Sequence, residues 1–503
     1  METMRNKILI FVLCLAYIAL RFWHLTDSCL WFDEIFSVHA AEHAWGDLLS
    51  FVALDLIHPP LFYVLLKLWI GVGGESLLWL RSLPVIFAVV SLFPFIAFLL
   101  ELKRTTSTIA ISLFFLIVNG SLLKYSQEVR MYSLLQCLSL VSMWLFARYL
   151  IKGKSFVPLV IVNIILVYTH YFGWFVVAGE VAAILIFQRI KWRRIALMVA
   201  ITLAAFVPWM IAVISAAKKS DGLGQNIGWM SRPGIMAILQ FKLALIEPFY
   251  YAAASIDPAS IYRITVPLLL IITAVFVIFL LNWKQNNADD KLAIYLLFIF
   301  IILPSLTAFA ASWLLPYSIW GTRHLIVVFA PVSILLAIAL AKVSSLSVKT
   351  AAITLIFLFS GYAFVLQAGR EKPDHIWCDW KIAASSFALG REPGENIYAF
   401  EDLAAYHLWF SLKDSDARVI LVNGTGLSED KAYFLPRGFD GVKTITEDQI
   451  AGEWVSVVFR AENMEITKSP IANLIARGYA VHSYGLYSAG AEKVYLVRLR
   501  KME

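Results

Sequence analysis

Long apolar runs alternate with short polar segments along the chain up to about residue 370. A helix needs about 20 mostly apolar residues to cross a bilayer. The runs of suitable length are 8–23, 77–100, 106–122, 132–150, 157–187, 195–215, 261–282, 292–314, 322–341 and 350–368. The run at 157–187 is interrupted by the letters THYFG, so we interpret it as a pair of helices. The pattern predicts about eleven membrane-spanning helices, with twelve or thirteen as alternatives.

One further apolar segment, at 59–74, does not fit as a crossing. Counting it as one would reverse the side of every later basic loop. We therefore expect a helix that lies at the outer interface or dips into it. Pro59 and Pro60 suit its first turn, where a missing N–H costs little.

Basic residues between the apolar runs fall on alternate connections. They lie near the start of the chain and at 102–104, 152–154, 189–194, 282–284 and 342–349. Because Lys and Arg are enriched on the cytoplasmic side, we expect the other connections outside, at 24–76, 123–131, 169–174, 216–260, 315–323 and beyond 370. This predicts a multi-pass protein of a bacterial-type plasma or inner membrane, with its C-terminal part extracytoplasmic.

The pattern of apolar and charged residues changes after residue 370. Residues 371–503 mix charged positions with short β-like runs at 396–400, 418–424, 454–459 and 493–499, and with a helical stretch at 470–478. We expect two domains. Residues 1–370 would form an α-helical polytopic membrane domain, and residues 371–503 a soluble extracytoplasmic α/β domain of small but ordinary size.

The composition agrees with a membrane protein. Of the 503 residues, 60% are hydrophobic and 15% charged, and the mean hydropathy is +0.76, whereas soluble domains are about half apolar and a quarter charged. The net charge of +7 is accounted for by the basic loops, so we expect no nucleic-acid partner. No cleavable signal is recognised, and the first helix is expected to remain as an anchor. The four cysteines have no metal or redox spacing. A disulfide between Cys29 and Cys378 is possible, but the sequence does not argue for it.

The adjacent acids Asp33 and Glu34 lie in the first outer segment. Ionisable residues at the rim of a membrane are costly and are candidates for function. Asp33 would act as a general base on an acceptor hydroxyl. In the alternative interpretation the pair is solvated, or Asp33 caps the helix that follows it.

His58 precedes Pro59 in the letters HPPL, three residues after Asp55. The two side chains would contribute to a polar pocket. Alternatively, His58 is a hydrogen-bonded structural residue. Asp33 and His58 are weak candidates for a divalent metal, because the spacing is not that of a zinc site. We name no certain cofactor.

The second outer segment is short and dense in polar and aromatic side chains. Its cations could hold a phosphate, for which the guanidinium of arginine is well shaped; alternatively, the tyrosines form an interfacial belt and Glu128 pairs with Arg130. The substrate-binding candidates here are Lys124, Tyr125, Gln127, Glu128, Arg130 and Tyr132.

Two later outer segments add candidates. Arg323 and His324 open an apolar run, and Arg323 could donate two parallel hydrogen bonds to a lipid phosphate or simply snorkel to the interface. His170 and Tyr171 lie in the segment at 169–174 and could line the same cavity.

Taken in order, these features resemble a known family. The acidic pair, HPPL, LRSLP at 80–84, YSQEVRMYSLL at 125–135, the His-aromatic segment and the late TRH at 322–324 are similar to the C-type (GT-C) glycosyltransferases. The resemblance is to the protein O-mannosyltransferase-like superfamily, which includes the bacterial enzyme that adds aminoarabinose to lipid A. It covers roughly residues 5–370.

The resemblance implies a role for individual residues. Asp33 matches the first-loop catalytic acid with Glu34 beside it, and Arg323 matches the Arg that holds the lipid phosphate. Glu128 and Arg130 match the second-loop motif, and His58 falls in the PPL motif. The chain departs from the pattern at Ile57, where aminoarabinose enzymes have Glu, and at His324, where many relatives have Tyr.

The resulting prediction is an inverting glycosyltransferase that moves a hexose or pentose from a polyprenyl phosphate donor to an acceptor. The acceptor would be a lipid, a glycan or a protein of the cell envelope. Alternatives are a transporter or flippase for lipid-linked glycans, and a glycan polymerase or ligase. A transporter would place its charges near the middle of the membrane on broken helices.

Overall fold

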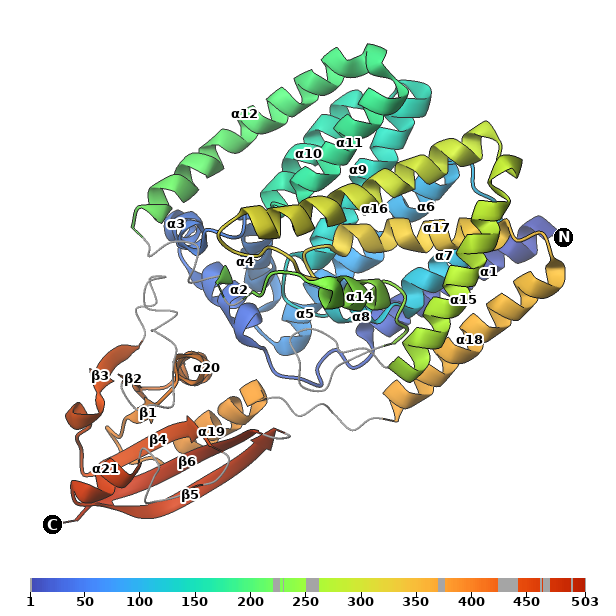
Figure 1. The fold of residues 1–503 in the computed structure, drawn as a ribbon. Coiled ribbons are helices and arrows are strands. Elements are labelled where there is room, and N and C mark those ends of the chain that lie inside the picture. The colour runs from blue at the N-terminus through green and yellow to red at the C-terminus, as the bar shows by residue number, and fades with distance from the viewer. Residues whose placement is uncertain are drawn as a thin grey trace. The chain divides into compact units, whose positions relative to one another are not determined.

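The computed structural model describes residues 2–219, 227–228, 230–249, 262–369, 376–423, 442–461, 464, 471–489 and 492–502. Parts of the predicted outer segment 216–260 lie outside these residues. In chain order the helices up to residue 368 are α1 (Glu2–Phe22), α2 (Phe32–Glu42), α3 (Trp45–Asp55), α4 (Leu61–Gly73), α5 (Leu77–Val90), α6 (Leu92–Glu101), α7 (Thr106–Val118), α8 (Gly120–Ser126), α9 (Tyr132–Lys152), α10 (Phe156–Thr169), α11 (Gly173–Phe187), α12 (Trp192–Ala217), α14 (Ile235–Ala244), α15 (Tyr262–Leu281), α16 (Ala288–Leu314), α17 (Phe329–Ala341) and α18 (Leu346–Ala368) (Figure 1).

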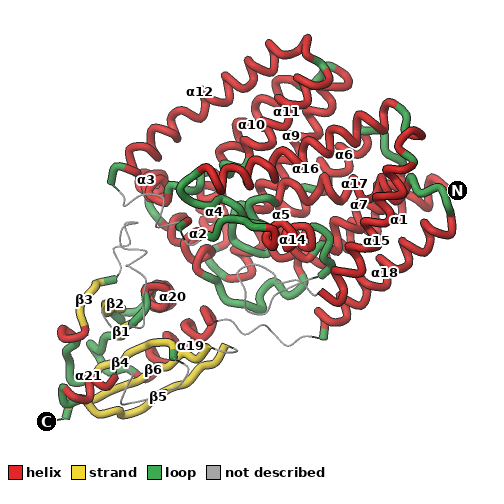
Figure 2. Tube along the Cα trace, in the orientation of Figure 1, coloured by secondary structure: helices red, strands yellow, loops and turns green. Residues whose placement is uncertain are grey.

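The chain divides into two compact units. The first contains Met1–Leu25, Leu48–Lys218 and Gly222–Arg370, and the second joins Thr26–Asp47 to Glu371–Glu503. Figure 2 shows that the first is helical and that the strands belong to the second. Residues Thr26–Asp47, which contain the acidic pair, therefore belong with the C-terminal part of the chain.

The helices of the first unit form a multi-pass membrane protein. Within the described residues, six helical stretches are long and apolar enough to cross a membrane, namely Leu77–Glu101, Tyr132–Lys152, Arg189–Ala217, Tyr262–Leu281, Ala288–Leu314 and Leu346–Ala368. Shorter apolar helices such as α7, α10 and α11 accompany them, and the count of about eleven spans stays a prediction. The segment at 59–74 forms α4, which begins directly after Pro60.

Apolar side chains face outward on the peripheral helices. Leu197 and Ile211 of α12 are 53% and 59% exposed, and Phe357 and Val365 of α18 are 63% and 65% exposed. By contrast, α17 is buried over most of its surface. A central helix that is apolar all round and outer helices with bare apolar faces are the pattern expected in lipid.

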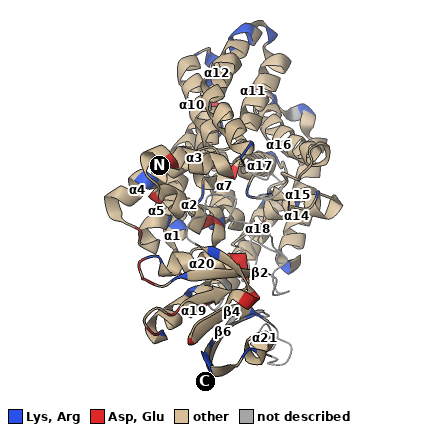
Figure 3. Ribbon diagram, turned by 90° about the vertical axis from the view of Figure 1, so that its left-hand side faces the viewer, with Lys and Arg blue, Asp and Glu red and all other residues tan. Residues whose placement is uncertain are grey.

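Salt bridges join several of the connections predicted to be cytoplasmic. Asp290, in the first turn of α16, accepts from Arg104 at 2.6 Å and also pairs with Lys342. Lys152 at the end of α9 lies 2.6 Å from Glu101 at the end of α6. Figure 3 shows the helices largely free of charge, with a further basic cluster in the turn between α11 and α12. The basic segments after α6, α9 and α17 are thus each tied to an acid at a helix end.

A polar network lies inside this apolar bundle. Ser142 of α9, Asn163 of α10 and Glu180 of α11 are fully buried. The Ser142 hydroxyl lies 2.7 Å from Oδ1 of Asn163 and 2.5 Å from Oε1 of Glu180, and Nδ2 of Asn163 donates to Oε2 of Glu180 at 2.6 Å. Side-chain hydrogen bonds thereby join three helices, and such bonds commonly stabilise helix association in membranes.

The second unit is an α/β sandwich around a mixed sheet. The strands lie in the order β3-β2-β1-β4-β6-β5; β1, β2, β3 and β4 pair in parallel, and β6 runs antiparallel to β4 and β5. Its elements after residue 370 are α19 (Ile376–Gly390), β1 (Ile397–Ala399), α20 (Asp402–Leu412), β2 (Val419–Asn423), β3 (Lys443–Thr446), β4 (Trp454–Arg460), α21 (Ile471–Ala476), β5 (Tyr479–Ala489) and β6 (Glu492–Lys501). The fold prediction is confirmed, although β3 and β5 were not foreseen.

Hydrophobic clusters cover both faces of this sheet. Ile397 and Ala399 of β1 pack with α19 and α20, while Tyr398 between them packs with α21. Alternate residues of a strand point to opposite faces, so β1 contributes to both clusters. Ile35 of α2 belongs to the first cluster. A disulfide links Cys29 to Cys378, with the Cα atoms 5.3 Å apart.

Candidate active site

A tight turn brings Asp55 and His58 together. α3 ends at Asp55, and Leu56 then adopts a φ of +64°, a left-handed conformation that is uncommon for a residue with a side chain and clusters at functional sites. Nδ1 of His58 lies 2.7 Å from Oδ2 of Asp55, and both side chains are buried. The expected pocket residues are therefore a hydrogen-bonded pair.

Arg130, from the turn before α9, completes the group. Its Nη2 lies 3.2 Å from Nε2 of His58, and its Nη1 donates to the Tyr63 hydroxyl at 3.3 Å. The same Nη2 lies 3.5 Å from Nδ1, and the position of the ring proton follows from Asp55. A carboxylate accepts, so Nδ1 of His58 donates its proton to Asp55. Two segments that are predicted to lie outside, 24–76 and 123–131, are thus joined by hydrogen bonds.

Tyr63 of α4 was not among the predicted site residues. It is fully buried and lies in α4, which is apolar except for Tyr63 and Lys67. Tyrosine in such a helix usually finds a partner for its hydroxyl. Its place five residues after His58 was the available signal.

The second outer segment is anchored to the end of α1. Nε2 of Gln127 donates to the carbonyl oxygens of Arg21 and Trp23, at 3.2 and 2.6 Å. The Arg21 guanidinium in turn donates to the carbonyls of Leu116 and Ile117, both at 3.0 Å, at the C-terminus of α7, where a cation is favourable. Gln127 is therefore a positioning residue for the turn that carries Arg130.

The remaining candidates of this segment lie around that turn. The ammonium group of Lys124 is 3.8 Å from the carboxylate of Glu128. The rings of Tyr125 and Tyr132 meet edge to face with centroids 5.4 Å apart. Both tyrosines are buried, which places them inside the unit rather than in an exposed aromatic belt.

His170 carries a buried hydrogen-bond donor. The backbone N–H of Phe172 donates to its Nδ1 at 3.1 Å, so the proton of the neutral ring is on Nε2. That Nε2 is buried and meets no acceptor among the residues that the structure describes. Burial lowers the pKa of His170 well below its usual value, and His58, His324 and Arg130 lower the pKa further. His170 is thus a neutral donor beside a cation.

Three imidazole rings lie next to one another here. The ring centroids of His170 are 5.7 Å from those of both His58 and His324. Nδ1 of His324 lies 3.2 Å from the carbonyl of Ile319. A Cβ at Gly321 would approach the His324 ring to 3.0 Å, so any other residue at 321 would push on this ring. Arg323, the residue before His324, is buried.

Tyr171 closes the group from the same loop as His170. Its hydroxyl donates to the carbonyl of Leu56 at 3.4 Å and accepts from Nε1 of Trp209 at 3.3 Å. Burial raises the pKa of Tyr171 to about 12, with a further contribution from Asp55. Tyr171 therefore remains a neutral phenol that holds the strained turn at Leu56.

The acidic pair belongs to the second unit and lies in the first turn of α2. The N-cap residue is Trp31, so the alternative in which Asp33 caps this helix is wrong. Oε2 of Glu34 accepts from the backbone N–H of Trp31 at 3.1 Å, and Glu34 is fully buried. Such reciprocal contacts stabilise a helix start. Asp33 is only partly buried.

The described residues around His58 in the first unit do not present a set of metal ligands. Within the described ranges, no three His, Cys, Asp or Glu side chains are placed to hold one. Both ring nitrogens of His58 are already engaged, by Asp55 and Arg130. A metal at His58 would therefore have to displace one of these partners.

The chemistry offered by the first unit suits an anion. Arg130 contributes a buried positive charge, and His170 a neutral N–H nearby. Preorganised donors in a site shielded from water stabilise negative charge that develops on a phosphate. The predicted residues from 55–58, 130 and 170–171 are brought together, as is His324.

Comparisons with known proteins give a fold. No family model matches the chain, and no curated protein matches it. Solved structures do. ArnT from Cupriavidus metallidurans bound to undecaprenyl phosphate is 12% identical, with a TM-score of 0.58 and 97% of each chain covered. The apo state of that protein is 11% identical, with a TM-score of 0.56 over 99% of this chain and 98% of that one.

An archaeal structure is similar as well. AglB from Archaeoglobus fulgidus, an oligosaccharyltransferase in complex with an inhibitory peptide and a dolichol-phosphate, is 12% identical, with a TM-score of 0.51 over 98% of this chain and 74% of that one. The resemblance noted in the sequence is confirmed at the level of the fold. The chain has the C-type (GT-C) glycosyltransferase fold, with a C-terminal α/β unit.

Proposed function

We propose that this chain is a glycosyltransferase that moves a sugar from a polyprenyl phosphate to an acceptor of the cell envelope. One observation carries the proposal. Arg130 is buried, and its guanidinium is oriented by His58, which bonds to Asp55. ArnT, which has a similar fold, is bound to undecaprenyl phosphate in its structure. The sugar would be a hexose or pentose, and the acceptor a lipid, a glycan or a protein.

The reaction is a direct displacement at the anomeric carbon. A new bond forms from the acceptor oxygen to this carbon while its bond to the phosphate oxygen breaks, which inverts the configuration. The phosphodiester of the donor becomes a phosphate monoester and gains negative charge. Arg130 and Arg323 would stabilise this charge, and Nε2–H of His170 would donate to the same group.

Asp33 would take the proton of the acceptor hydroxyl as general base. Asp33 is partly buried and lies in the first turn of α2. Glu34 stabilises the start of this helix by accepting from the backbone N–H of Trp31. Glu34 would support the helix rather than the chemistry. We further propose that the donor is bound by residues 1–370 and that residues 371–503, which share a unit with Thr26–Asp47, are concerned with the acceptor.

The C-terminal part would be extracytoplasmic. The basic connections after α6, α9 and α17 favour the cytoplasm for the opposite ends of the helices. The Cys29–Cys378 disulfide supports an oxidising compartment for the second unit, since disulfides are rare in the cytosol.

Binding of the lipid carrier tests the first half of the proposal. Full-length protein in nanodiscs would be titrated with undecaprenyl phosphate, and the bound fraction measured by native mass spectrometry. The Arg130→Gln variant should bind about tenfold to a hundredfold less tightly, because a hydrogen bond to a charged group contributes about 1.5–3 kcal/mol. Arg148→Gln, which replaces an arginine near the opposite end of α9, is the matched control.

Transfer tests the second half. In a strain that lacks the chain, a glycosyl polyprenyl phosphate should accumulate among the envelope lipids. An Asp33→Asn variant should bind undecaprenyl phosphate normally and fail to restore transfer. Normal transfer by Asp33→Asn would refute the base assignment. Intact binding by Arg130→Gln would refute the phosphate site, and movement of lipid-linked glycan without transfer would identify a flippase.

A further inference from the structure

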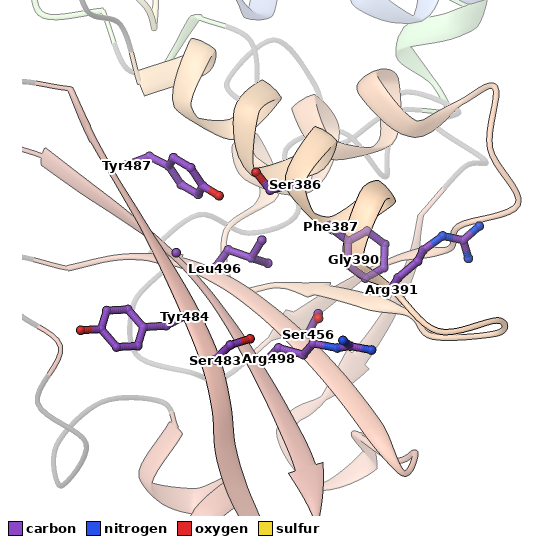
Figure 4. A pocket seen from close by; sticks show the side chains of 11 residues that line it. Ser386, Phe387, Gly390, Arg391, Ser456, Ser483, Tyr484, Tyr487, Leu496 and Arg498 are labelled. Carbon is purple, nitrogen blue, oxygen red and sulfur yellow. The ribbon is translucent and has the colours of Figure 1, made fainter.

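The second unit contains a pocket of about 230 Å³ between the end of α19 and the sheet. Figure 4 shows it bounded by Ser386 and Phe387 of the helix and by β4, β5 and β6. Phe387 belongs to the buried cluster on this face of the sheet, and Leu496 of β6 packs against it. The floor is therefore apolar and rigid.

A polar row crosses the three strands on the pocket side. The register places Ser456 of β4 and Ser483 of β5 on either side of Arg498 of β6. The pairing of β5 with β6 shifts between Val481 and Ser483, and such irregularities re-aim side chains beside binding sites. The shift is what brings Ser483 onto the row.

The charges at this pocket are already balanced. Arg498 donates to both oxygens of Glu395, at 3.2 and 2.7 Å, and its guanidinium lies 4.2 Å from the ring centroid of Trp454. Arg391 pairs with Asp416. Since each guanidinium has a carboxylate partner, the pocket favours a neutral polar ligand over a phosphate.

Tyr487 supplies an aromatic wall. Its ring projects toward the middle of the pocket, while the ring of Tyr484 points away (Figure 4). A Cβ on Gly485 would lie 2.8 Å from the Tyr487 hydroxyl, so glycine at 485 leaves room for that ring. The hydroxyls of Ser386, Ser483 and Tyr487 have no hydrogen-bond partner within the described part of the chain.

We infer that this pocket binds one neutral sugar ring. Hydroxyl donors and acceptors at the edges of a ring, with an aromatic face beside it, match the two surfaces of a saccharide. The volume is below the ~300–1,000 Å³ of pockets for larger ligands, which fits a single ring. That this sugar belongs to the glycan acceptor rests on the proposed function, whereas the binding itself does not.

Ligand-observed saturation-transfer NMR tests the inference on the full chain in nanodiscs. The neutral probes are methyl glycosides of glucose, galactose, mannose and N-acetylglucosamine, and the anionic probes are glucuronate and glucose 6-phosphate. At least one neutral glycoside should bind. Tyr487→Ala should weaken its binding about tenfold, through loss of the aromatic wall, and Tyr484→Ala should leave it unchanged.

A second variant covers a failure of Tyr487→Ala to fold. Ser483→Phe fills the pocket from an exposed strand position and should abolish binding. Absence of any neutral glycoside signal, unchanged binding in Ser483→Phe, or tighter binding of the anions would overturn the inference. Undecaprenyl phosphate binding is measured on the same samples. Its loss with glycoside binding intact would refute the proposed function alone.

Discussion

The guanidinium of Arg130 lies 3.2 Å from Nε2 of His58, whose other ring nitrogen is 2.7 Å from Asp55. His58 thus links the carboxylate of Asp55 to the guanidinium of Arg130. The neutral imidazole orients the guanidinium, a group whose shape and charge suit a phosphate.

An Asp55→Asn variant should disturb this orientation. The asparagine amide carries no charge and can present either its oxygen or its N–H group to Nδ1 of His58, so the charge-assisted hydrogen bond that fixes the ring and its proton is lost. Affinity for undecaprenyl phosphate should fall about tenfold, the cost of one lost hydrogen bond, as measured by native mass spectrometry.

Asp289→Asn is the matched control for this variant. Asp289 is 54% exposed, pairs with Lys103 and lies at the start of α16, and surface pairs contribute little. Equal affinities in Asp55→Asn and Asp289→Asn would show that the aspartate does not aim Arg130.

The network of Ser142, Asn163 and Glu180 predicts a protonated acid. The Ser142 hydroxyl has one proton but lies within hydrogen-bonding distance of both Asn163 Oδ1 and Glu180 Oε1. Both contacts are satisfied if Glu180 donates its own proton to Ser142. A Glu180→Gln variant reproduces this donor and should keep the melting temperature in detergent. Glu180→Ala should lower the melting temperature, because the lost hydrogen bonds contribute about 1–2 kcal/mol to the free energy of unfolding.

Ser305→Ala provides a comparison for that experiment. Ser305 bonds only to the carbonyl of Ile301 in its own helix, so its loss should have little effect. If Glu180→Gln were as unstable as Glu180→Ala, the acid would have to be ionised and the assignment of its proton would be wrong.

His407 makes the second unit sensitive to acid. Burial lowers the pKa of His407 from 6.5 to about 4, and its Nδ1 lies 2.9 Å from the carbonyl of Leu403. Between pH 6.5 and 4 the unfolded chain binds a proton that the folded unit does not. Stability is therefore complete above pH 6.5 and falls by about 3 kcal/mol on acidification to pH 4.

Hydrogen exchange of β1 and α20 as a function of pH measures this loss. A His407→Phe variant should flatten the decline between pH 6.5 and 4, and His482→Gln, at an exposed position, should not. A decline with the same slope in His407→Phe and in the unchanged protein would assign the proton uptake to other groups.

The hydrophobic pattern located most helices because the bilayer imposes their length. The pair at 157–187 was resolved correctly at His170, and α9, α15 and α18 begin and end within a few residues of the predicted runs. The run at 77–100 is divided at Ser91 into α5 and α6. The hydroxyl of Ser91 donates to the carbonyl of Ala88. A hydropathy pattern cannot predict such a local contact.

The strands were predicted where apolar residues dominate and missed where they do not. β1, β2, β4 and β6 are rich in Val, Ile and Leu. β5 is an edge strand in which Ser, Gly and His interrupt the pattern, and it forms because β6 supplies its hydrogen bonds. Strand formation there depends on a partner and not on local propensity.

The site was predictable as a set of outer polar residues but not as a geometry. Asp55 and His58 share one turn, whereas Arg130 and His170 come from two other segments, and no spacing in the sequence predicts the distances between the segments. The left-handed turn at Leu56 is equally hidden, because leucine has no preference for that conformation. A tertiary contact supports it, because Tyr171, which accepts from Trp209, donates to the carbonyl of Leu56.

The Cys29–Cys378 disulfide closes the second unit across a separation of 349 residues, and it gives the last prediction. Both cysteines replaced by serine should leave α2 less firmly held, and hydrogen exchange in Phe32–Glu42 should rise, since native disulfides typically contribute about 2–4 kcal/mol. Non-reducing peptide mapping of the membrane-purified protein should find this pair linked and Cys14 and Cys137 as free thiols. Double replacement of Cys14 and Cys137 is the control and should not change exchange in α2. Recovery of Cys29 and Cys378 as free thiols from native membranes would place the second unit in a reducing compartment and contradict the proposed orientation.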